Sequence, residues 1–191
     1  MVFLDFLPVG ILLGFLLGGS VSGLVDLLGI RSLWLAYAAI ALQIAAFPSG
    51  VFPWSTPDGV ARGLWLVSYA LLAALVIQNR RVQGIMLIGI GQACNVIAVV
   101  ANGGHMPVTR GALAASGRSY DLHNNSISLV HPHLSWLVDR WAVASWAPFG
   151  NVYSIGDYLI GTGLLVTLVV AMGPTRFVSG SSVRLAHADL D

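Results

Sequence analysis

The chain has 191 residues, of which 57% are hydrophobic and only 9% are charged. A soluble domain carries about 25% charged residues, so we expect an integral membrane protein. All basic residues are Arg and all acidic residues are Asp, which excludes catalysis by lysine or glutamate. The formal net charge of +1 and the lack of a basic cluster argue against nucleic-acid binding. Cys94 is the only cysteine, so an intramolecular disulfide is excluded.

Several stretches are long and apolar enough to cross a bilayer, which takes about 20 residues per helix. We predict an all-α bundle of about five transmembrane helices, near residues 6–25, 33–47, 62–79, 84–102 and 154–173. They form one transmembrane domain over 1–175. Residues 103–153 form an external loop, and residues 176–191 form a polar cytoplasmic tail.

The first predicted helix carries a ladder of small residues, Gly10, Gly14 and Gly18, four residues apart. This spacing lets two helix backbones approach closely in lipid. The partner of this face is another helix of the same chain, a second protomer or another membrane protein. The spacing alone does not decide between them.

The orientation in the membrane is predicted from the arginines in short loops, which mark the cytoplasmic side. The clearest positive position is the turn with Arg80 and Arg81, between the third and fourth helices. We therefore expect a multi-pass protein of the cell membrane with its N-terminus outside and its C-terminus in the cytoplasm. The 103–153 loop is then external.

The fourth predicted helix carries three amides, Gln92, Asn95 and Asn102, on one side. An unsatisfied amide facing lipid costs several kcal/mol, so we expect these side chains to face the bundle interior, together with Gln43. Two interpretations stay open. The amides either make hydrogen bonds between helices or line a polar cavity that receives a ligand or a proton.

The last predicted helix opens with Ser154 and Asp157, spaced as an N-cap and its capping-box partner. An ionisable group at a transmembrane entrance is also a candidate functional residue. The two roles are compatible.

In the external loop, residues 134–146 hold three Trp around one Asp-Arg pair, which predicts an amphipathic helix lying in the membrane interface. His131 and His133 flank a proline, but neither Cys nor Glu accompanies them. We therefore assign no metal site and no cofactor. No motif for nucleophilic catalysis occurs, so we assign no catalytic residue.

Two segments, Asn-Gly-Gly-His-Met-Pro-Val at 102–108 and Tyr-Ser-Ile-Gly-Asp at 153–157, resemble an uncharacterised bacterial family of small polytopic membrane proteins. That family is known only as a domain of unknown function, and the resemblance covers nearly the whole chain. It implies a bacterial membrane protein and carries no activity or cofactor with it. It groups the following residues into one structural or binding feature: Asn102, Gly103, Gly104, Met106, Pro107, Gly156 and Asp157.

The leading hypothesis is a non-enzymatic membrane protein with an outward-facing polar pocket that binds or passes a small molecule, a lipid headgroup or an ion. We expect Gln92, Asn95, Asn102 and Asp157 to line this pocket and the Asn-Gly-Gly turn at 102–104 to form its rim. We also place Met106 and Pro107 among the ligand-binding residues. One alternative is an accessory subunit of a larger membrane complex, or a homo-oligomer, assembled through the glycine face. A second alternative is a membrane enzyme that uses His and Asp of the external loop.

Overall fold

The computed structural model describes residues 2–48, 54–117, 126–144, 146 and 151–173, and these residues are mostly helical. The predicted tail, 176–191, lies outside them. The elements in chain order are α1 (Val2–Leu16), the 3-10 helix η1 (Val21–Gly29), α2 (Trp34–Ala46), α3 (Asp58–Gln78), α4 (Ile85–Ala101), β1 (Met106–Val108), α5 (Arg110–Ser116), β2 (Ser126–Ser128), β3 (Trp141–Ala142), β4 (Val152–Tyr153) and α6 (Ile155–Ala171).

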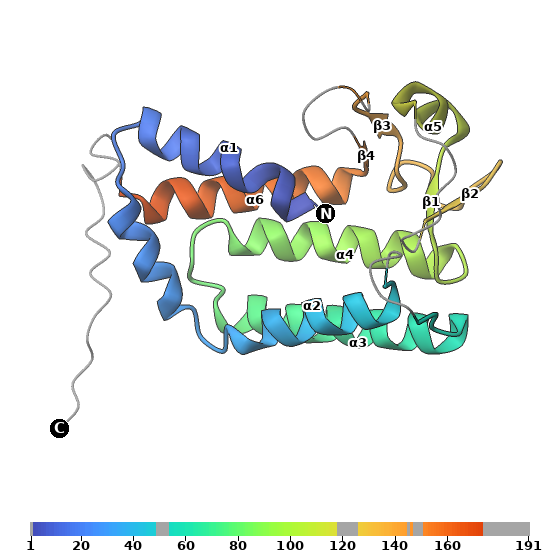
Figure 1. Ribbon diagram of the computed structural model, residues 1–191, viewed down its shortest axis with the longest axis horizontal. Helices are drawn as coiled ribbons and strands as arrows, with labels where there is room; N and C mark the ends of the chain where they lie inside the picture. The colour runs from blue at the N-terminus through green and yellow to red at the C-terminus, as the bar shows by residue number, and fades with distance from the viewer. Residues whose placement is uncertain (1, 49–53, 118–125, 145, 147–150, 174–191) are drawn as a thin grey trace.

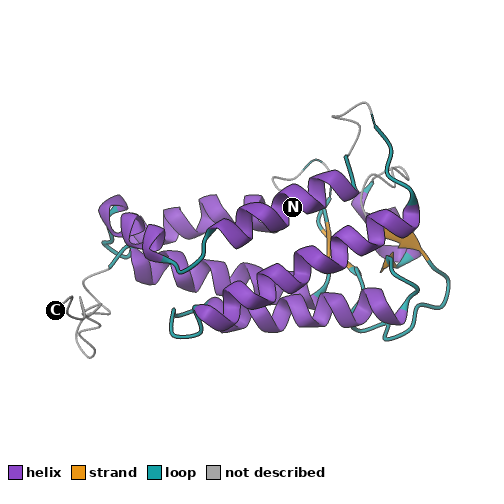
Figure 2. Ribbon diagram, turned by 90° about the horizontal axis from the view of Figure 1, so that it is seen from below, coloured by secondary structure: helices purple, strands orange, loops and turns teal. Residues whose placement is uncertain are grey.

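The long helices lie side by side along one axis (Figure 1). α1 packs on α6, α6 on α4, α4 on α3, and α3 on α2, so α4 joins an α1/α6 pair to an α2/α3 pair. The strands gather at one end of the bundle (Figure 2), which we call the loop end. The turn between α3 and α4 lies at the opposite end (Figure 1).

The mostly helical fold is as predicted, but the described strands β1 to β4 correct the prediction of an all-α chain. The number of membrane spans stays a prediction. Of the described helices, α3 alone is long and apolar enough to cross a membrane by length and composition. Four shorter apolar helices accompany it, Asp5–Leu16, Trp34–Ala46, Ile85–Ala101 and Ile155–Ala171.

The first helix differs from the prediction of one helix over 6–25. α1 ends at Leu16, Gly18 takes a left-handed conformation with φ +87°, and the chain continues as η1. A glycine in this conformation is a common helix stop, so Gly18 does not extend the face of Gly10 and Gly14. A Cβ on Gly10 would lie 2.6 Å from Cδ1 of Leu168, so this face packs on α6 of the same chain.

The predicted interfacial helix over 134–146 is wrong. The described residues of this segment form turns and strand β3, and Leu134 has φ +51°. The backbone of Asp139 pairs with β1 instead, since its N–H donates to Pro107 O and its carbonyl accepts from Thr109 N. The helix in the loop is α5, which begins where the Thr109 hydroxyl caps it.

Two short sheets complete the loop end. β1 pairs in parallel with β2, and β3 pairs antiparallel with β4. A small apolar core of Val108, Ala112 and Val152 holds β1, α5 and β4 together. Because β4 leads directly into α6, this core fixes the position where α6 begins.

Candidate functional site

The site depends on the close approach of α4 and α6, which glycines permit. A Cβ on Gly156 would lie 2.6 Å from the carbonyl oxygen of Gly91 and would also strike the Asn95 side chain. Further along the pair, a Cβ on Gly163 would lie 2.7 Å from the Gly84 carbonyl oxygen. Small residues at such a crossing let polar side chains bridge two backbones.

Asn95 is the side chain that bridges α4 and the start of α6. Its Nδ2 donates to Oδ1 of Asp157 at 2.9 Å, and its Oδ1 accepts from the Ser154 hydroxyl at 2.8 Å. Asn95 is 7% exposed and Ser154 is fully buried. Both ends of the Asn95 amide are therefore used inside the protein.

The first turn of α6 has the predicted capping box, which is confirmed. The Ser154 hydroxyl accepts from the Asp157 N–H at 3.0 Å, and Oδ2 of Asp157 accepts from the Ser154 N–H at 3.0 Å. Asp157 thus gives one carboxylate oxygen to the cap and the other to Asn95. The predicted cap and the polar contact exist together.

A second carboxyl group, Asp139, lies near this network. Asp139 is 9% exposed, its Oδ1 is closed to solvent, and no residue in the described part of the chain hydrogen-bonds to that atom. Burial raises the pKa of Asp139 well above its usual range, and the negative charge of Asp157 raises it further. The burial of Asp139 differs from the predicted interfacial helix, and its one signal in the sequence is the apolar pair Leu137-Val138 directly before it.

Tyr69 of α3 belongs to the same region, because both carboxylates interact electrostatically with its phenol. The register of α3 against α4 explains this. Two contacts fix this register: Gly89 lies against Val76, and the Gly103 carbonyl accepts from Arg62. Tyr69 lies midway between Arg62 and Val76 along α3, so it is level with residue 96 of α4. We call Tyr69, Asn95, Asp139, Ser154 and Asp157 the polar cluster.

The other predicted site residues have different surroundings. Gln92 is 6% exposed on α4, one residue from Gly91, so it faces the bundle interior as predicted. Asn102 instead ties the loop to the end of α4. Its Nδ2 donates to Ala98 O at 2.7 Å and to His133 O at 3.0 Å, and its Oδ1 accepts from the His133 N–H at 2.8 Å.

The glycines of the predicted rim, and Met106 and Pro107 after them, have a structural arrangement that explains their sequence. Gly103 and Gly104 have φ of +74° and +95°, which favour glycine. Arg62 of α3 donates to the Gly103 carbonyl at 3.1 Å, and Met106 and Pro107 continue into β1 opposite Ser126 and Ile127. None of these contacts joins the rim to Asn95 or Asp157 within the described part of the chain.

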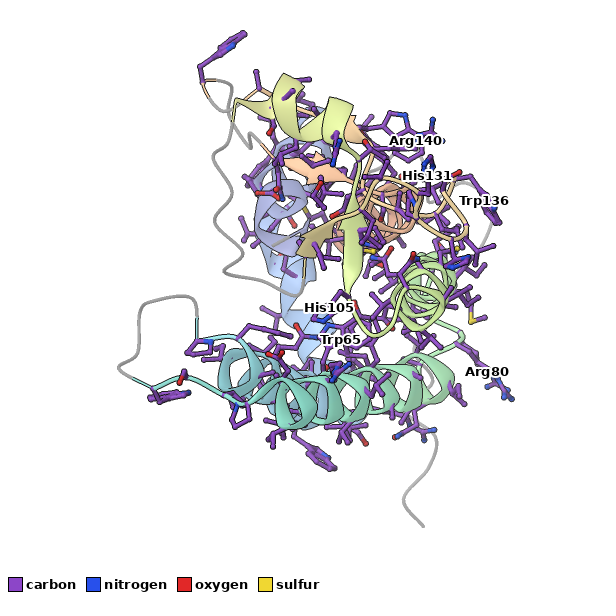
Figure 3. The ribbon with its side chains drawn as sticks, turned by 90° about the vertical axis from the view of Figure 1, so that its right-hand side faces the viewer. Trp65, Arg80, His105, His131, Trp136 and Arg140 are labelled. Atoms are coloured by element: carbon purple, nitrogen blue, oxygen red, sulfur yellow. The ribbon has the colours of Figure 1, made fainter. Side chains whose placement is uncertain are left out.

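The loop end also carries the histidines of the predicted external loop. His131 is exposed, and Figure 3 shows it with Trp136 and Arg140 along the outer edge of the loop end. Across the described residues, which leave out Asp121 and His123, no three metal-ligating side chains come together.

The fold and the cluster together define a helical bundle with a buried polar centre at its loop end. Residues 27–169 match the model of a family described as a family of unknown function (DUF5317), which covers well over half of the chain. The chain therefore belongs to this family, and the match includes Asn95, Asp139 and Asp157. No curated protein and no solved structure matches the chain. Membership of an uncharacterised family is confirmed, while the bacterial and membrane character implied by the resemblance stays a prediction.

Proposed function

We propose that the chain is a multi-pass membrane protein that binds a small ligand at the polar cluster. The distribution of side chains supports the membrane part of this proposal. Large apolar side chains point outward from the long helices, for example Leu16 (72% exposed), Ile77 (63%) and Val100 (59%). Polar side chains such as Ser68 and Thr167 are buried. A helix of a water-soluble bundle has the opposite distribution.

Helix length and charge placement also support membrane insertion. α4 and α6 each have 17 residues, which at about 1.5 Å per residue reach the lower limit for a spanning helix. The exposed Arg80 and Arg81 follow α3, at the end opposite the polar cluster. We propose that this end faces the cytoplasm and that the polar cluster lies near the external surface.

The chemistry of the polar cluster favours a ligand that carries positive charge. The cluster offers two carboxylates, and within the described part of the chain no Arg or His side chain hydrogen-bonds to either. The observation that carries the proposal is Oδ1 of Asp139, which is buried and has no donor among the described residues. Such an atom is costly to keep unpaired, so a bound positive charge would stabilise the fold.

Binding is tested by thermal unfolding of the purified protein in lipid nanodiscs. The probes are Na⁺, K⁺, methylammonium and choline at fixed pH, and the proton itself through a pH series. We expect at least one probe to raise the unfolding temperature of the parent, and less so that of Asp139→Asn. Gln43→Ala serves as the control, because Nε2 of Gln43 donates to the Ser68 hydroxyl at a separate contact of α2 with α3. Equal responses of the parent and Asp139→Asn to every probe would refute the proposal.

The two alternative functions receive less support. Gly10 and Gly14 lie against α6, so they do not offer the open face that an accessory subunit or homo-oligomer would use. Among the described residues, His131 and His133 take part in no group of three metal-ligating side chains, so no described arrangement favours an enzyme at the external loop.

A further inference from the structure

We propose that Asp139 is a proton-binding site, with a carboxyl group that is protonated in the folded protein and coupled electrostatically to Asp157. This inference rests on the polar cluster of the proposed function and names its ligand. It does not depend on insertion into a membrane.

The backbone of Asp139 holds its side chain inside the protein. The N–H donates to Pro107 O at 3.0 Å, and the carbonyl accepts from Thr109 N at 2.9 Å. The two preceding residues, Leu137 and Val138, are 2% and 0% exposed. This pairing with β1 holds Oδ1 of the carboxyl group away from solvent.

The burial of Oδ1 favours a proton over larger cations at this atom. Oδ1 is closed to solvent and has no hydrogen-bond partner in the described part of the chain. An ion or ammonium group of the size of water or larger does not reach this atom in the closed structure, whereas a proton needs no added volume. A buried carboxylate without a partner is far more costly than a buried neutral carboxyl group.

The proton is assigned to Asp139 rather than to Asp157 because of their different partners. Asp157 accepts from the Ser154 N–H and from Nδ2 of Asn95, and both donors favour a carboxylate. Oδ1 of Asp139 accepts from no described residue. The proton therefore resides on Asp139, the carboxyl group that has no donor to Oδ1 among the described residues. Its positive charge relieves the repulsion between Asp139 and Asp157.

The elements around Asp139 supply few other charged groups. The neighbouring Arg140 is exposed, with its guanidinium 5.5 Å from the centre of the Trp141 ring, and Figure 3 shows it at the outer edge of the loop end. Asp157 is the acidic group that acts on Asp139. The other titratable or charged residues on the surrounding described elements are Asp58, Arg62 and Tyr69 on α3, Cys94 on α4, His105 before β1, Arg110 on α5, Tyr153 on β4, and Tyr158 on α6.

The inference predicts a pH dependence with a definite sign. The pKa of Asp139 is raised in the folded state, so its contribution to stability is complete below the ordinary Asp range, about pH 4. That contribution to stability is lost as the pH rises towards the raised pKa of Asp139 in the folded protein. Within this window, each pH unit increases the unfolding equilibrium constant by up to about tenfold.

The test combines this pH series with infrared spectroscopy of protein labelled with ¹³C in the Asp side chains. We expect a protonated-carboxyl band near neutral pH in the parent and in Asp58→Asn, whose exposed Asp58 serves as the control. We expect the band and the pH-dependent loss of stability to disappear in Asp139→Asn. We also expect Asp157→Asn to move the titration of Asp139 to lower pH.

Absence of a protonated-carboxyl band in the parent overturns the inference even if Asp139→Asn fails to fold. A band that survives in folded Asp139→Asn overturns it as well. The membrane proposal can fail separately. In that case the outer faces of the helices are exposed to water, while the protonated-carboxyl band of Asp139 is still present.

Discussion

Replacing Asn95 by Ala removes the side chain that joins α4 to the first turn of α6. The change leaves Oδ1 of Asp157 without its donor and the Ser154 hydroxyl without its acceptor. The bond to the carboxylate is worth about 1.5–3 kcal/mol and the neutral bond about 0.5–1.5 kcal/mol. Because Asn95 is 7% exposed, water does not readily replace either partner. We therefore expect Asn95→Ala to lower the free energy of unfolding by about 2–4 kcal/mol.

The assay is reversible unfolding in mixed detergent micelles, followed by tryptophan fluorescence. Gln43→Ala is the matched control, because it removes one neutral hydrogen bond, from Nε2 of Gln43 to the Ser68 hydroxyl at 3.1 Å. Hydrogen bonds between membrane helices average about 0.6 kcal/mol, so we expect a loss of that order for the control. If Asn95→Ala costs no more than Gln43→Ala, the bridging role assigned to Asn95 is refuted.

Three further changes test the packing of the bundle and of its loop end. Gly156→Ala places a Cβ against Asn95 and the opposing backbone, so we expect it to lower the free energy of unfolding by about 1–3 kcal/mol. Gly59→Ala is the control, because its Cβ meets open space, and it should have little effect. Asn102→Ala frees the backbone N–H of His133, and hydrogen exchange at that amide should accelerate; unchanged exchange would contradict the anchoring role. Gly14→Leu drives a side chain into α6, so the isolated chain should unfold at a lower temperature at every protein concentration, whereas an effect confined to high concentration would indicate a contact between protomers.

The helical part of the fold was predictable because it depends on local composition. Long apolar runs bounded by Arg, Asp and Pro gave regions that correspond to α3, α4 and α6. The capping box at Ser154 was predictable for the same reason, since its partners lie three residues apart. The end of α1 was not, because a left-handed Gly18 and an ordinary helical glycine are identical in sequence.

The polar cluster was predictable only in part, because it depends on tertiary contacts. The burial of Gln92 and Asn95 followed from the cost of exposing amides, and Asp157 followed from its position at a helix entrance. The partner of Asn102 is the backbone of His133, which no side-chain pattern encodes. Asp139 was missed because its burial results from the pairing of its backbone with β1, while the three nearby Trp favoured a helix.

Site-directed spin labelling tests most directly the claim that this bundle lies in a membrane. Single cysteines at Leu66, Ile90 and Arg80, in a Cys94→Ser background, carry the label in reconstituted liposomes. Leu66 and Ile90 are 47% and 50% exposed on α3 and α4, and Arg80 lies in the exposed turn between them. A bundle embedded in lipid predicts that oxygen relaxes the labels at Leu66 and Ile90, whereas a water-soluble nickel chelate relaxes only the label at Arg80. Equal access of the chelate to Ile90 and Arg80 would contradict the membrane proposal.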